Sequence, residues 1–165
     1  MTTINRNDSD SDSDSNSNSN NDSDDSDSSD SSAITCQRIA DASRMQHTDT
    51  LFGLQFPMRL EPTIYDMAGR LALEYRGGYW EFNALSNGGF FMAPRANTIF
   101  AVSSDNGFEG QLSADALGIT ACLYAYSHLS FSDGAFAVTC ADQFHLLREY
   151  AMDHAEARAI VAAID

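Results

Sequence analysis

The sequence predicts an α+β fold, in which a small antiparallel three-stranded β-meander packs with about four to five α-helices after a disordered acidic tail. Three observations predict it. Residues 8–32 contain only Asp, Ser and Asn, apolar residues recur at helical spacing in several later segments, and the period changes to two between residues 79 and 103. The segments show no βαβ alternation, which argues against a parallel sheet.

The acidic tail has a composition that cannot form a core. Residues 8–32 hold nine Asp, twelve Ser and four Asn, with no apolar or basic side chain. Such a segment buries too little apolar surface to offset the entropy of ordering, so we expect residues 1–32 to be disordered. Residues 33–165 have an ordinary composition and suffice for a single domain.

Both parts of the chain are acidic. Nine Asp against Arg6 give the tail a formal charge of −8, and fifteen carboxylates against eight Arg give the remainder −7. The sequence has no Lys, and scattered Arg in an acidic domain do not form a stripe that follows phosphates. We therefore expect no direct binding to nucleic acid or to an anionic membrane.

The location of the protein is predicted from what the sequence lacks. No signal peptide is recognised, and no apolar run approaches the length of about eighteen residues that spans a bilayer. Cys36, Cys122 and Cys140 are an odd number without CxxC spacing, which favours reduced thiols. We expect a cytoplasmic protein, with a monomer as the default.

Two helices are predicted before the strands. Residues 33–49 have weak helical periodicity and are assigned to the first. Residues 61–78 form a clear second, with Pro62 at a first helical position and Gly77 at the end. Its apolar stripe consists of Ile64, Met67, Ala68, Leu71, Ala72 and Tyr75.

The predicted meander follows this second helix. Residues 79–85 and 90–94 have the alternation and aromatic content of strands. Between them, Asn87 and Gly88 can both adopt positive φ and close a tight primed turn. Residues 98–103 are predicted to be the third strand, and residues 104–111 a loop.

Three helices are expected after the loop. Ser113 can cap the first, with Asp115 in its first turn, and the almost continuous apolar sequence that follows predicts a helix through the centre of the domain. Capping-box spacings, Thr139 with Asp142 and Asp153 with Glu156, predict two short final helices.

The sequence contains few signals of catalysis. Without Lys there is no Walker A lysine and no amine for a Schiff base. No GxGxxG, GxSxG or HExxH motif is present, and the four His lack the context of a metal site, so no metal or cofactor is predicted. Glu81, Glu109 and Asp115 could meet and share acid–base work, although each also has a structural explanation.

Long segments of the chain resemble the ArdB/KlcA antirestriction proteins. The resemblance rests on GGYWEFNALSNGGFFMAP at 77–94, NGFEGQLSADALGITACLYAYSHLSF at 106–131 and the closing segment 144–165. It implies a cytoplasmic protein, typical of plasmids and other mobile elements, that relieves type I restriction-modification of incoming DNA. The family is not known for a catalytic centre, so the resemblance implies no catalytic residues.

This resemblance leads to a contact surface and to two alternatives. We expect non-catalytic action through contact with a protein of the restriction pathway. The candidate partner-binding residues are Tyr79, Glu81, Asn87, Phe108, Glu109 and Asp115. The alternatives are a small hydrolase that uses Glu109, Asp115 or a His, and an interaction module that presents the acidic tail. Asn83 departs from the family, whose members often have an aromatic residue there, as does Ala155, where they often have Pro.

Charge spacing argues against DNA mimicry by the tail. Nine Asp between Asp8 and Asp30, extended at roughly 3.4 Å per residue, place one charge every 8 Å or so. Duplex DNA presents one about every 1.7 Å. We therefore expect residues 33–165 alone to carry the activity.

Overall fold

The computed structural model describes residues 33–165, and the predicted acidic tail lies outside these residues. The α+β class and the three-stranded antiparallel sheet are confirmed. The elements in chain order are β1 (Cys36–Arg38), η1 (Asp41–Ser43), α1 (Arg44–Phe52), η2 (Phe56–Leu60), α2 (Glu61–Leu71), β2 (Trp80–Leu85), β3 (Phe90–Pro94), β4 (Ile99–Ser103), β5 (Glu109–Ser113), α3 (Ala114–Ser130), α4 (Ala135–Met152) and α5 (Ala157–Ile164).

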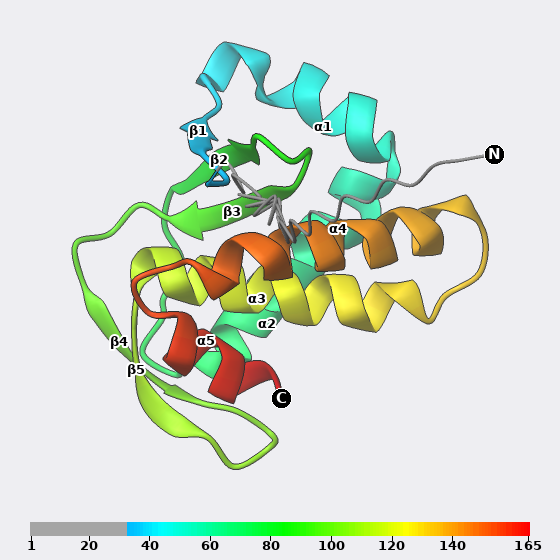
Figure 1. Ribbon diagram of the computed structural model, residues 1–165. Helices are drawn as coiled ribbons and strands as arrows, with labels where there is room; N and C mark the ends of the chain where they lie inside the picture. Colours follow the sequence, from blue (N-terminus) through cyan, green and yellow to red (C-terminus); the bar gives the residue numbers. More distant parts are fainter. Residues whose placement is uncertain (1–32) are drawn as a thin grey trace, which may run out of the picture. The chain divides into compact units, whose positions relative to one another are not determined.

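The strands are divided between two sheets (Figure 1). β1, β2 and β3 form a three-stranded antiparallel sheet, whereas β4 pairs with β5 in a separate two-stranded sheet. The prediction that residues 98–103 complete the meander was therefore wrong, although they do form a strand. Residues 109–111, assigned to a loop, belong to β5 instead, where Ser103 lies opposite Glu109.

The first predicted helix is half wrong. Residues 36–38 form β1, and the first α-helix begins only at Arg44, after the short helical turn η1. β1 pairs with the outer edge of β2, with Gln37 opposite Ala84. These backbone hydrogen bonds outweigh the weak helical periodicity of the segment, because they cover an edge of β2 that would otherwise be exposed.

The turn between β2 and β3 differs from the predicted primed turn. Gly88 N donates to Leu85 O at 2.9 Å, and Leu85 N donates to Gly89 O at 2.8 Å. These bonds enclose a three-residue loop, residues 86–88, with positive φ at Gly88 (91°). The longer loop places the Asn87 side chain against α4, where its Nδ2 donates to Leu146 O at 2.9 Å.

Helix α2 is confirmed, but it ends earlier than Gly77. Pro62 lies in its first turn, and Ile64, Ala68 and Leu71 are buried. Ala72 is extended, with φ −120° and ψ 94°, so the chain leaves the helix there. Tyr75 instead packs on Trp80 and accepts a hydrogen bond from its Nε1.

Helix α3 passes through the middle of the domain, as predicted, and contacts α2, α4, α5 and β3 (Figure 1). Ser113 caps it, accepting a hydrogen bond from Ala116 N at 3.2 Å. Gly118 allows close contact with the sheet: a Cβ there would lie 2.5 Å from Ala93 Cα and 2.6 Å from Met92 O. A side chain larger than hydrogen would force α3 away from β3.

The outer edge of β3 is covered by side chains from the helices. Phe90 N donates to Gln143 Oε1 at 2.8 Å, and Phe90 O accepts from the Tyr126 hydroxyl at 2.9 Å. Met92 N and O both contact the Cys122 thiol, at 3.4 and 3.5 Å. Side chains of α3 and α4 therefore take the place of a fourth strand at this edge, and all of β3 is buried.

The last two helices exist, but their predicted caps were wrong. α4 starts at Ala135, so Thr139 lies inside it and donates to Ala135 O at 3.2 Å. Asp153 ends α4, and Glu156 precedes α5 without a side-chain capping bond. α4 is also long, at 18 residues. None of the helices in residues 33–165 combines the length and apolarity needed to cross a bilayer.

We predict that Gly118→Ala lowers the free energy of unfolding by about 1–3 kcal/mol, because overpacking against β3 exceeds the gain in helix propensity. Gly69→Ala is the matched control, since Gly69 is also helical and a Cβ there meets nothing within 4 Å. Gly69→Ala should raise the free energy of unfolding by up to about 1 kcal/mol. Urea denaturation measures both changes. A Gly118→Ala protein as stable as the wild type would contradict the close contact.

Candidate functional site

A charged cluster lies across the first sheet, on the side chains of β1, β2 and the segment after β3. Glu81 Oε1 is 3.3 Å from Arg38 Nη1 and 3.5 Å from Arg95 Nε. The antiparallel register explains this arrangement, because Glu81 lies opposite Ala93 and diagonally from Arg38. Glu81 is therefore held between two guanidinium groups, and its charge is neutralised locally.

Tyr79 extends this cluster towards η1 and α1. The guanidinium of Arg44 lies 4.7 Å from the centre of the Tyr79 ring and 4.6 Å from that of Phe82, and its Nη2 is 3.0 Å from Asp41 Oδ1. A hydrogen bond from the Tyr79 hydroxyl lowers the pKa of Asp41. Within residues 33–165, Arg44 Nε is buried and has no hydrogen-bond partner.

Two of the predicted site residues line one cavity. Glu81 and Asp115, from β2 and the start of α3, border a cavity of about 520 Å³ that we call the polar cavity. Asn83 is buried in its wall. The remaining lining residues are Ala93, Pro94, Arg95, Ala96, Asn97 and Ala114. Packing of α3 on β3 thus brings together residues that are 34 positions apart in the sequence.

His154 connects Asp115 to the segment before α5. Its Nε2 is 3.1 Å from Asp115 Oδ2, and in the neutral ring its Nδ1 accepts a hydrogen bond from Glu156 N at 3.0 Å. The carboxylate of Glu156 in turn accepts from Ser113 N at 3.0 Å and from the Ser113 hydroxyl. Both ring nitrogens are therefore occupied, and His154 has no nitrogen free to activate a nucleophile.

Cys36 and Tyr150 lie close to Asp115 but are not activated. Burial raises the pKa of the Cys36 thiol, and the charge of Asp115 raises it further. Burial also raises the pKa of Tyr150 to about 12. Both groups are protonated at neutral pH, so the cluster contains neither a thiolate nor a phenolate nucleophile.

The other four predicted residues do not line the polar cavity: Tyr79, described above, and Asn87, Phe108 and Glu109. Asn87 has a structural role, since its Nδ2 donates to Leu146 O and to Glu149 Oε2 at 3.1 Å. Phe108 lies over Gly110, where its ring occupies the space of a Cβ. Glu109 is exposed at the end of β5.

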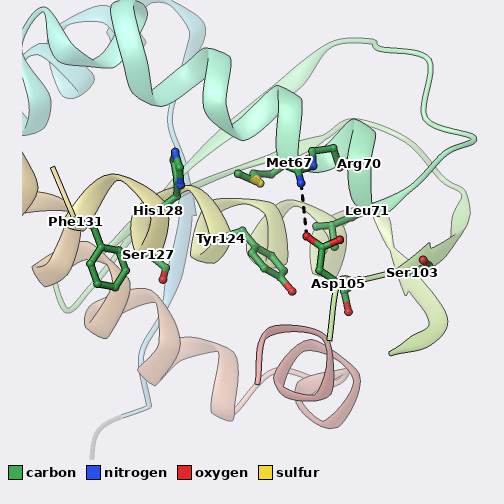
Figure 2. A pocket seen from close by; sticks show the side chains of 10 residues that line it. Met67, Arg70, Leu71, Ser103, Asp105, Tyr124, Ser127, His128 and Phe131 are labelled. Atoms are coloured by element: carbon green, nitrogen blue, oxygen red, sulfur yellow. Dashed lines mark ion pairs between the residues drawn. The ribbon is translucent and has the colours of Figure 1, made fainter. Parts of the chain in front are cut away.

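A second cavity, of about 390 Å³, lies between α2, α3 and the turn after β4 (Figure 2). Figure 2 shows Arg70 facing Asp105, with 3.5 Å between Nη2 and Oδ2. His128 and Phe131 line it from the end of α3. This cavity was not predicted from the sequence, because its residues come from three distant segments.

Neither cavity provides metal-ligand chemistry. Among residues 33–165, no three His, Cys, Asp or Glu side chains lie close enough to hold a metal ion together. In the second cavity Asp105 is already paired with Arg70.

The Asp115–His154 pair predicts a pH-dependent stability. The hydrogen bond to Asp115 raises the pKa of His154 above its ordinary value. When the pKa of a histidine is higher in the folded than in the unfolded protein, its protonation stabilises the folded state. This stabilisation is complete at pH values below the unfolded pKa and is lost as the pH rises through the folded pKa. Asp115→Asn should therefore lower the free energy of unfolding by about 0.5 kcal/mol more at pH 5.5 than at pH 8.5.

Urea denaturation at the two pH values tests this prediction. Asp66→Asn is the control, because the partner of Asp66, at 4.0 Å, is an arginine rather than a histidine. Its effect should be the same at both pH values. An Asp115→Asn effect that does not change with pH would contradict the charged pair.

Comparison with known proteins identifies relatives of the whole described domain. A family model described as antirestriction protein matches residues 73–165. The chain is 42% identical over 139 residues to the antirestriction protein KlcA of Escherichia coli. This match covers 81% of this chain and 95% of KlcA. It is also 39% identical over 136 residues to the uncharacterized protein YafX of Escherichia coli strain K12. That match covers 80% of this chain and 88% of YafX.

A solved structure of the KlcA and ArdB proteins is also similar. The TM-score is 0.75 and the identity 41%, over 80% of this chain and 95% of that chain. Those proteins are described as having a novel fold and antirestriction activity against Type I DNA restriction systems in vivo but not in vitro. With a matching family model over residues 73–165, a relative at 42% identity and a shared fold, the chain belongs to the antirestriction protein family of KlcA and ArdB.

Proposed function

We propose that this protein relieves type I restriction of incoming DNA, acting in the cytoplasm without catalysis, through contact with a protein of the restriction pathway. The observation that carries the proposal is the identity of 42% with KlcA over 95% of its length. Activity of relatives in vivo but not in vitro is expected when a cellular component beyond the purified system is required. Contact with such a component agrees with that behaviour.

The chemistry of the polar cavity supports a non-catalytic role. Glu81 is held by Arg38 and Arg95, and His154 has both ring nitrogens engaged. A hydrolase needs a base that can accept a proton from water or from a nucleophile. The hydrolase alternative with Glu109 and Asp115 is not supported either, since only Asp115 lines the cavity.

The distribution of charge supports protein contact over DNA mimicry. A DNA mimic needs a dense and regular series of carboxylates. In this domain Asp41, Asp66, Glu81 and Asp105 are each paired with Arg, and Asp115 is paired with His154. These pairs interrupt any continuous acidic surface.

We propose the contact surface around Tyr79, Glu81 and Asp115. Tyr79 is 45% exposed, and its ring covers Arg44. Exposed aromatic and Arg side chains are common among residues that dominate protein interfaces. We also propose that residues 33–165 act as a single domain, with the acidic tail dispensable, and that the protein is a monomer.

The first test compares the full chain with residues 33–165. Unmodified phage is plated on a host with an active type I system, with either form or with an empty vector. Both forms should raise the plating efficiency equally, because we assign the contact to the domain. Equal plating with the full chain and with the empty vector would contradict the proposed function, and protection by the full chain alone would favour the module that presents the tail.

The second test addresses the contact surface. Tyr79→Ala should reduce protection, because removal of an interface aromatic residue weakens binding about 5- to 30-fold. Tyr79→Phe keeps the ring over Arg44 and should retain most of the protection. Glu109→Ala, at an exposed position outside the polar cavity, is the matched control. Equal losses in Tyr79→Ala and Glu109→Ala would contradict the proposed surface.

A further inference from the structure

A large apolar depression lies beside the charged cluster, and Arg44 and Phe82 both line it. It has a volume of about 920 Å³, and we call it the apolar groove. α1, η2 and β2 contribute its walls, which include Met45, Leu54, Phe56, Pro57 and Phe82. Arg44 lines the groove and also stacks on Tyr79, so the groove is continuous with the proposed contact surface.

The apolar groove has an uncovered apolar rim. Met45 is 83% exposed and Leu54 is 79% exposed, and nearby Met58 is 74% exposed. Phe56 and Phe82, by contrast, are buried in the floor. Met45 and Leu54 both line the groove, so large apolar side chains are exposed at its edge, as is common at binding sites.

The sequence of α1 explains why this patch is not part of the core. Met45, Thr48 and Phe52 follow each other at three and four residues and thus share one face of the helix. Thr48 and Phe52 are buried at the end of that face, whereas Met45 continues it beyond the core. One face of α1 is therefore only partly covered by the domain itself.

The rim of the apolar groove is negatively charged. Asp49 and Glu61 both border it, and neither forms an ion pair within residues 33–165. Glu61 only accepts a hydrogen bond from the Tyr65 hydroxyl, at 3.0 Å. The charge of Arg44 is already balanced by Asp41, 3.0 Å away. The groove thus combines an apolar floor with two carboxylates available to a cation.

We propose that the apolar groove binds a segment of a partner protein that inserts apolar side chains and places Lys or Arg next to Asp49 and Glu61. The inference rests on the proposed action by protein contact, and it specifies the chemistry of the partner. Helix-in-groove recognition, with apolar anchors on one face and basic residues beside them, has these properties. Electrostatic attraction to the acidic domain also favours a basic segment.

Charge argues against other occupants. The acidic tail contains no apolar side chain between residues 8 and 32 and carries nine Asp, so it fits neither the floor nor the rim. A second copy in a two-fold symmetric contact would bring identical acidic rims together. Nucleic acid would be repelled by the same carboxylates. A basic and apolar protein segment satisfies both features of the groove.

The test uses a fluorescein-labelled amphipathic helical peptide of Leu and Lys, and a second peptide with Glu in place of Lys. Fluorescence anisotropy measures binding of each peptide to the full chain at physiological ionic strength, where non-specific attraction is screened. The Leu–Lys peptide should bind and the Leu–Glu peptide should not.

Matched variants locate the binding. Leu54→Asp and Met45→Asp should each weaken binding of the Leu–Lys peptide about 10-fold or more, because a charge replaces an apolar anchor. Leu73→Asp is the control, since Leu73 is 75% exposed outside the groove and the substitution changes the net charge equally. Asp49→Asn should also weaken binding, whereas Glu74→Gln should not. Circular dichroism confirms that each variant is folded.

Three results would overturn the proposal. Equal binding by Leu54→Asp and Leu73→Asp would show that only bulk charge attracts the peptide, and equal binding of the Leu–Glu peptide would exclude the basic partner. A dimer of the wild type in sedimentation analysis that Leu54→Asp abolishes would assign the groove to a second copy.

Phage plating separates this proposal from the proposed function. If the wild type gives no protection but the peptide results hold, the proposed function fails and the groove remains a binding site. If Leu54→Asp loses the peptide but protects as well as the wild type, the groove is not the antirestriction contact, and the connection between the two proposals is overturned. The proposal is supported if Leu54→Asp loses both peptide binding and protection while Leu73→Asp retains both.

Discussion

Side chains of α3 and α4 form hydrogen bonds with the backbone groups along the outer edge of β3, and the rest of the domain depends on this constraint. A buried backbone N–H or C=O without a partner costs about 1–3 kcal/mol, so each bond from Gln143, Tyr126 and Cys122 to Phe90 and Met92 must be kept. Because these side chains come from α3 and α4, neither helix can slide along the strand. The register of the helices against the sheet is thereby fixed.

This register also determines the geometry of the polar cavity. β3 pairs with β2, which carries Glu81, and the same strand holds α3, which carries Asp115 at its first turn. Ser113 and Glu156 then fix the start of α3 to the segment before α5. The charged groups are consequently held by neighbours on several sides, which fixes their positions relative to one another.

Several elements could be predicted because their signals are local. α2 and α3 have long apolar patterns, and the strands 80–85 and 90–94 alternate around an Asn-Gly turn sequence. β1 and β5 could not be predicted, since CQR and EGQLS have weak patterns and become strands through pairing with distant segments. Residues Glu81 and Asp115 were both identified, but only the packing of α3 on β3 shows that they share a cavity. The apolar groove was missed because the exposure of Met45 depends on where the neighbouring elements end.

The three cysteines differ sharply in accessibility, and this difference provides an internal chemical label. Cys36 is exposed, whereas Cys122 and Cys140 are buried, with burial raising their thiol pKa values to about 12 and about 11. A thiol-specific reagent will therefore attach a dye or spin label at Cys36 in the folded protein without any engineered substitution. Slow modification of the two buried thiols then reports transient opening of the same α3 and α4 contacts that cover β3, since the reagent reaches Cys122 only when that contact breaks.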